Sequence, residues 1–154
     1  MKTGGGARSV ALEALLEIEH SAAFADEVLD RRLSRAGLDA RDRALTFELV
    51  YGVLRHKATL DWRLAQVADR PIERLPRVVA TALRLAAYQL LFLERIPASA
   101  AVNESVALAK SIRPTARIPA KDWSGFVNAG LRSLTREPAP PWPDPDLDPV
   151  AALA

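Results

Sequence analysis

The sequence contains no cysteine and only two histidines among 154 residues. Without cysteine the chain can form no disulfide, hold no thiolate zinc site and use no cysteine nucleophile. His20 and His56 are too few for a histidine-built metal site, and neither has a serine or cysteine partner at a catalytic spacing. No glycine-rich turn follows a strand, as a nucleotide cofactor would require. We therefore expect no catalytic residue, no metal and no cofactor in this chain.

Long apolar runs are also missing. The longest, residues 78–93, has 16 residues and carries Arg84 and Gln89, whereas a spanning helix needs about 20 apolar residues. Residues 1–9 lack the apolar region of a signal peptide, and the absence of cysteine fits a reducing compartment. We expect a cytoplasmic protein with no membrane partner.

Helical spacing of apolar residues dominates the chain, and no stretch alternates in the way a strand does. Asp39 and Ser99 are suitable N-caps. Gly52, inside one helix, indicates close approach by a neighbouring helix, and the nearly all-apolar segment 77–94 is typical of a central helix. The pattern predicts an all-α bundle of about seven helices, at 7–19, 24–36, 40–56, 59–68, 77–94, 100–112 and 123–136.

Composition changes abruptly after residue 137, because residues 138–149 contain six prolines. The sequence therefore predicts three parts: a flexible tail at 1–6, a helical domain at 7–137 and a Pro-rich acidic linker at 138–154. The linker carries three aspartates and no base, so residues 1–137 have a net charge of +5 while the whole chain has +2.

Arginine outnumbers lysine by 17 to 4. The planar guanidinium suits phosphate and stacks on bases, which favours a nucleic-acid partner. Ordinary exposed, ion-paired faces would explain the same residues equally well. The basic clusters are Arg31-Arg32-Arg35, Arg41 with Arg43, Arg55-His56-Lys57, and Arg132 with Arg136.

Five stretches, in chain order, carry a resemblance to a known family. They are ARSVAL at 7–12, DRALTFELVYGVLR at 42–55, LRLAAYQL at 83–90, IP at 96–97 with VNESV at 102–106, and GFVNAGLR at 125–132. Together they resemble NusB-like domains, and most closely the N-terminal RNA-binding domain of 16S rRNA 5-methylcytosine methyltransferases of the RsmB/Sun type. Residues 148–154 are similar to the DP-x-x-x-L-A element that precedes the catalytic domain of those enzymes.

The resemblance implies an RNA-binding NusB-like bundle whose partner is rRNA. It also implies that S-adenosylmethionine and the catalytic cysteines belong to a methyltransferase domain, joined to or docked on this one, so that this chain alone is not an enzyme. Arg8, Arg43, Arg55 and Arg132 fall on matching motif positions, and with Lys57 they are the predicted RNA-binding residues. For Arg43 an ion pair with Glu48 or Asp42 is an equal alternative.

Other polar and aromatic residues of these stretches have structural interpretations. Asn103 and Asn128 are predicted to form hydrogen bonds between helices. Tyr51, Tyr88 and Trp123 are predicted to lie in the core.

Two other functions remain open. A stand-alone NusB antitermination factor would bind boxA RNA together with ribosomal protein S10, and relatives of this kind can form homodimers. A helical protein-interaction module would have no affinity for RNA.

Overall fold

The computed structural model describes residues 6–68, 70–93, 95–111 and 123–136. Within them the chain forms seven α-helices and one 3-10 turn, and no strand. The all-α prediction is confirmed, whereas the 3-10 turn between α4 and α5 was not predicted. In chain order the elements are α1 (Ala7–Ser21), α2 (Ala25–Ala36), α3 (Ala40–Arg55), α4 (Lys57–Val67), η1 (Ile72–Arg74), α5 (Arg77–Phe92), α6 (Ala98–Lys110) and α7 (Ser124–Arg136).

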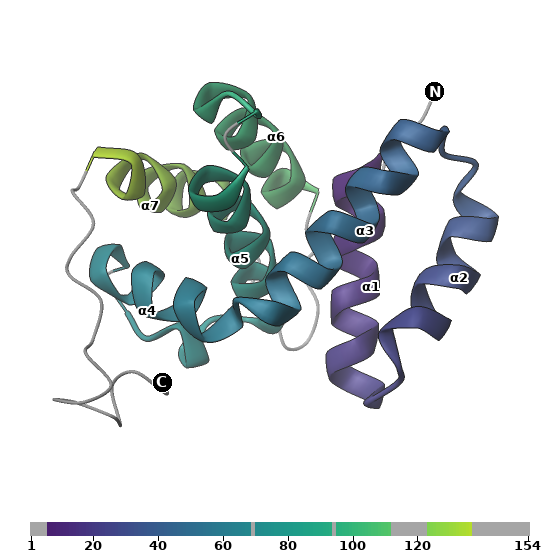
Figure 1. The fold of residues 1–154 in the computed structure, drawn as a ribbon. Coiled ribbons are helices and arrows are strands. Elements are labelled where there is room, and N and C mark those ends of the chain that lie inside the picture. Colours follow the sequence, from purple (N-terminus) through teal and green to yellow (C-terminus); the bar gives the residue numbers. More distant parts are fainter. Residues whose placement is uncertain (1–5, 69, 94, 112–122, 137–154) are drawn as a thin grey trace, which may run out of the picture.

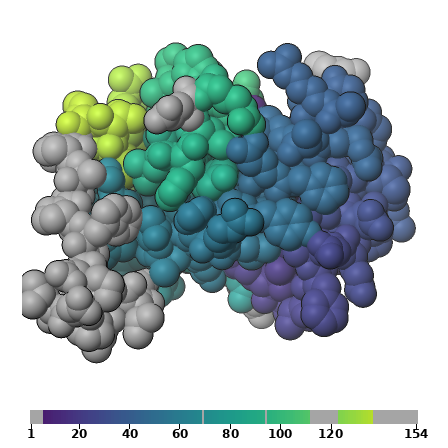
Figure 2. Space-filling model, viewed as in Figure 1, coloured from purple at the N-terminus to yellow at the C-terminus, as the bar shows by residue number. Residues whose placement is uncertain are grey.

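Helix α5 lies at the centre of the bundle (Figure 1). It packs against α1 and α3 on one side and against α4, α6 and α7 on the other, while α1, α2 and α3 pack on one another. The space-filling view places the two groups of helices side by side (Figure 2). Because α5 is apolar on nearly every face, it can be covered from all sides, and the predicted central position is confirmed.

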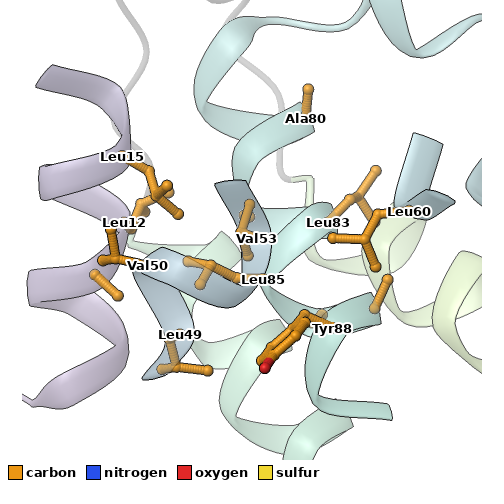
Figure 3. Packing of buried hydrophobic residues seen from close by; sticks show 14 of the residues in the cluster. Leu12, Leu15, Leu49, Val50, Val53, Leu60, Ala80, Leu83, Leu85 and Tyr88 are labelled. Carbon is orange, nitrogen blue, oxygen red and sulfur yellow. The ribbon is translucent and has the colours of Figure 1, made fainter. Parts of the chain in front are cut away.

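One apolar core joins both groups (Figure 3). Leucine and valine side chains from α1, α3 and α5 meet there, and most are fully buried. Burying one such side chain contributes about 1.5–3 kcal/mol. The labelled members are Leu12 and Leu15 of α1, Leu49, Val50 and Val53 of α3, Leu60 of α4, and Ala80, Leu83, Leu85 and Tyr88 of α5.

Helices α3 and α5 approach closely at Gly52. A β-carbon placed on Gly52 would lie 2.1 Å from Cζ of Tyr88, far inside van der Waals contact. The absence of a side chain at residue 52 therefore lets the Tyr88 ring lie against α3. The predicted reason for this glycine is confirmed, as is the burial of Tyr88 and Trp123. Tyr51 packs against the edge of the core, where its hydroxyl donates to Asp26.

Two predicted helix starts are wrong. Asp39 caps α3 as predicted, since its Oδ1 accepts from the Asp42 amide at 2.8 Å. Ser99 caps nothing, because extended Pro97 starts α6 directly and Ser99 falls in the first turn. Helix α4 begins at Lys57 rather than Thr59, because His56 alone separates α3 from α4.

Among the described helices, none is long and apolar enough to cross a membrane. Of the predicted tail, residues 1–6, only Gly6 is described, and the predicted linker, residues 138–154, falls outside the described residues.

Candidate nucleic-acid interface

Three adjoining hollows run across the surface formed by α1, α3, α6 and α7. The first, of about 540 Å³, is lined by three arginines, Arg8, Arg41 and Arg95, and by three acidic residues, Asp39, Asp42 and Glu48, among others. The second, of about 270 Å³, lies at the first turn of α1 and is also lined by Arg8. The third, of about 470 Å³, lies between α6 and α7 and shares Ala107 with the second. We call the cations of these hollows the basic track: Arg8, Arg41, Arg95, Lys110 and Arg132.

Arg8 lies where two of the hollows meet. Its Nε donates to Oε1 of Gln89 at 2.7 Å. Gln89 is 1% exposed and is itself fixed by donating to the Leu85 carbonyl at 3.0 Å. The acceptor is thus neutral and rigid, and it uses one of the five guanidinium N–H groups. No carboxylate of the described residues forms an ion pair with Arg8, so its charge is positioned without being neutralised.

The first turn of α1 adds further positive potential beside Arg8. Gly6 precedes the helix and provides no side-chain cap, so the amides of the first turn have no side-chain acceptor there. Such N-terminal amides and the helix dipole together favour an anion. Gly6, Ala7 and Ser9 line the second hollow, which places this potential and the Arg8 guanidinium around the same space.

Arg132 repeats the arrangement on α7. Its Nε donates to Oδ1 of Asn128 at 3.1 Å, one turn earlier. Lys110, in the last turn of α6, is exposed and lines the same hollow. Asn128 therefore holds a cation within its own helix, and Asn103 is exposed without a hydrogen bond in the described part of the chain. The prediction that these asparagines join helices is wrong.

The other predicted RNA-binding residues lie off the track. Arg43 donates to the Leu33 carbonyl at 3.3 Å, at the end of α2. The alternative of an ion pair with Glu48 or Asp42 is wrong, because the side chain reaches the carbonyl end of α2 instead. Arg55 and Lys57 flank His56 at the corner between α3 and α4 and are exposed. With a rise of 1.5 Å per residue, Arg55 lies roughly 21 Å along α3 from Arg41.

Sequence reasoning missed three members of the track. Arg41 appeared only within a basic cluster, and Arg95 and Lys110 were not singled out. They belong to three separate segments, namely α3, the turn after α5 and α6, and only the fold brings them beside Arg8 and Arg132. The one local signal was the spacing of four between Asn128 and Arg132, which puts both on one helix face.

A second set of arginines is engaged by carboxylates. Arg32 pairs with Glu13 at 3.1 Å and Glu17 at 2.8 Å, and Arg31 pairs with Glu17. Buried Arg84 of α5 pairs with Asp61 of α4 at 2.7 Å and Glu19 of α1 at 3.7 Å. On the track, only Arg95 has such a pair, with Glu48. No group of three or more histidine, aspartate or glutamate residues in the described segments could hold a metal ion.

Comparison with known families decides the identity of the fold. The model of the NusB family matches residues 6–136, which takes in every described helix. The chain belongs to the NusB family. The resemblance seen in the five sequence stretches is thereby confirmed.

The relatives of this NusB domain are of two kinds. It is 40% identical to a probable ribosomal RNA small subunit methyltransferase B of Bacillus subtilis, over 96% of this chain and 31% of that protein. A protein of the same name from Synechocystis is 42% identical, over 84% of this chain and 28% of the relative. The transcription antitermination protein NusB of Paenarthrobacter aurescens is 38% identical, over 88% of this chain and 95% of that protein. The NusB domain thus spans about a third of the methyltransferases and nearly all of the antitermination protein.

Proposed function

We propose that this NusB domain binds RNA along the basic track and engages small-subunit rRNA for a cytosine-C5 methyltransferase. The observation that carries the proposal is the way in which the Arg8 guanidinium is held. A guanidinium held by a buried neutral amide, at the junction of two hollows, keeps its full charge and four free N–H groups. Charge-assisted hydrogen bonds from such a group to phosphate are short and strong.

The rest of the track fits a backbone-contacting surface. Arg41, Lys110 and Arg132 add cations along the hollows, and none of them has a carboxylate partner in the described residues. A row of cations in a groove is the feature by which proteins follow a nucleic-acid strand. Asn103 and Asn128 add amides to the α6–α7 hollow, where they supply polar contacts between the cations.

The proposed substrate class rests on the relatives. Two methyltransferases named for the small ribosomal subunit match this chain at 40% and 42% identity. The chain has no cysteine that could act as the nucleophile of cytosine-C5 methylation, and the described segments contain no strand beside which a nucleotide crevice for S-adenosylmethionine could form. Methyl transfer is therefore assigned to the rest of such a protein and no step of it to this chain.

A second candidate function is transcription antitermination. The observation in its favour is the antitermination protein of Paenarthrobacter aurescens, 95% of which aligns with this chain. In that role the domain would prefer boxA RNA and bind ribosomal protein S10.

A titration at two salt concentrations tests the proposal. Fluorescence anisotropy measures binding of the chain to a small-subunit rRNA fragment and to boxA RNA at about 50 mM and about 200 mM salt, a range over which phosphate contacts weaken steeply. We expect tighter binding to the rRNA fragment and a strong loss of affinity at the higher salt. Preference for boxA would favour antitermination. Absence of binding to both RNAs at low salt would contradict the RNA-binding function and leave a protein-interaction module.

A further inference from the structure

Two large apolar side chains are exposed among the described residues, Phe24 and Phe92. Phe92 is the last residue of α5 and is 38% exposed. An aromatic ring left at the surface loses the stabilisation that burial would give it. The residues around Phe92 therefore indicate what kind of partner could cover its ring.

Phe92 belongs to a cluster of three nearly parallel rings, which we call the aromatic corner: His56, Tyr88 and Phe92. The His56 and Phe92 centroids lie 4.3 Å apart with planes inclined by 19°. Tyr88 lies 5.3 Å from Phe92, inclined by 20°, and 6.2 Å from His56. Gly52 admits the Tyr88 ring and so supports the cluster from below. The result is a stack of rings in which Phe92 is the most exposed member.

Cations surround this corner. Arg55 and Lys57 flank His56 in the chain, and both are exposed without a partner in the described residues. Burial and the charge of Glu48 raise the pKa of Tyr88, whereas the charges of Arg55 and Arg95 lower it. Both guanidinium groups therefore lie close enough to act on the Tyr88 hydroxyl. The corner thus combines a stacking surface with positive charge.

The corner also lies near one end of the basic track, at Arg95. Arg95 and Glu48 line the hollow that contains Arg8, and the same two residues act on the Tyr88 hydroxyl. Arg95 therefore lies near both the first hollow and the aromatic corner, so a strand whose phosphates follow the track past Arg95 would come close to the corner.

We infer that the aromatic corner binds an unpaired RNA base, stacked on the exposed part of the Phe92 ring, with adjacent phosphates on Arg55 and Lys57. The inference rests on the proposed function and adds a second contact to it. Bases stack on aromatic side chains with little sequence preference, because every base has a π-face. This explains why cations and rings occur together here, as neither hydrophobic docking nor a phosphate site alone would require both.

Phe24 supplies the matched control. It is 77% exposed, precedes α2 and is followed by Asp26 and Glu27 in the first turn. No ring of the described residues stacks on it. An acidic surrounding repels phosphate, so the two exposed phenylalanines differ in the property that matters. Phe92→Leu and Phe24→Leu each replace a phenylalanine ring with an apolar side chain that has no ring, one in each environment.

The experiment titrates wild type and both variants with a labelled single-stranded RNA of about 12 nucleotides, a length within the range of known single-strand sites, over several salt concentrations. We expect Phe92→Leu to weaken binding by about fivefold or more, since stacking contributes at this level, with an unchanged salt slope because no phosphate contact is lost. Phe92→Trp should retain the affinity, and Phe24→Leu should bind like wild type.

A second measurement uses unmodified protein. RNA carrying the fluorescent base 2-aminopurine, moved through the strand, should be quenched at one position by wild type. Equal affinities of Phe92→Leu and Phe24→Leu, or no quenching at any position, would overturn the aromatic contact while RNA binding by wild type leaves the proposed function standing. If wild type binds no RNA, both fail.

Discussion

The arginines of two neighbouring surfaces differ in what holds them. Between α1 and α2, Arg31 and Arg32 are held by the carboxylates of Glu13 and Glu17. On the basic track, Arg8 and Arg132 are held by the amides of Gln89 and Asn128. A carboxylate neutralises the guanidinium, whereas an amide fixes its direction and leaves its charge. The difference teaches that the partner of an arginine, more than the arginine itself, separates a residue that joins helices from one that can bind phosphate.

Substitution of Arg84 should cause the largest loss of stability, because Arg84 is the buried member of the arginines that pair with carboxylates. Its side chain is 11% exposed and lies between Asp61 of α4 and Glu19 of α1. Arg84→Ala would leave two partly buried carboxylates unpaired, and we expect unfolding to become easier by about 3 kcal/mol. Urea denaturation measures this change.

Arg31→Ala is the matched control, because its ion pair is more exposed and should contribute less than about 1 kcal/mol. Equal losses in the two variants would contradict the distinction between a buried and a surface pair.

Gly52→Ala should come next, with a loss of about 2 kcal/mol from overpacking. The added β-carbon would lie 2.1 Å from the Tyr88 ring. This contact therefore depends on close packing, whereas the contacts of Arg84 depend on charge. Gly130→Ala on α7 is the control, because no atom lies within 4 Å of a β-carbon there. It should be neutral or slightly stabilising, since alanine favours helix. Thermal or urea unfolding measures the stability of both variants. Equal stabilities would contradict the close approach of α3 and α5 at Gly52.

The smallest expected effect is a dependence of folding stability on pH that comes from Tyr51, which bonds to a carboxylate of α2. The hydrogen bond to Asp26, then burial and the charge of Asp26, raise the pKa of Tyr51 above its ordinary value of 10.0. The folded state thus favours the neutral phenol. The resulting stability is fully present below pH 10 and is lost as pH rises through the raised pKa.

Tyr51→Phe should therefore reduce the fall in urea stability between about pH 9 and about pH 11, the range around the ordinary tyrosine pKa. Tyr88, whose pKa is also raised, leaves part of the fall in place. An undiminished fall in Tyr51→Phe would show that the hydrogen bond to Asp26 has no such role.

Helix count, the central place of α5 and the Asp39 cap could be predicted from sequence, because periodicity and capping are local. Ser99 could not be assigned, since a proline two residues earlier set the helix start. The single-residue corner at His56 was likewise hidden, because nothing in the apolar pattern distinguishes one linking residue from three.

The site was less accessible to sequence reasoning. Arg8 and Arg132 followed from the resemblance, but their amide partners differ in kind: Asn128 is four residues from Arg132, whereas Gln89 is 81 residues from Arg8. Arg43 shows the converse, since its partner is a backbone carbonyl that no residue type reveals. Which arginines have no carboxylate partner is a property of the tertiary fold.

The most direct test compares Arg8→Gln with Arg31→Gln in RNA binding over a range of salt concentrations. Both variants remove one positive charge, but only Arg8 is proposed to contact phosphate. For a single strand, each lost phosphate contact lowers the slope of log affinity against log salt by about 0.7. We predict weaker binding and a slope smaller by about that amount for Arg8→Gln, and wild-type binding for Arg31→Gln. Equal changes in the two variants would contradict the account, because total charge rather than an amide-held arginine would then govern binding.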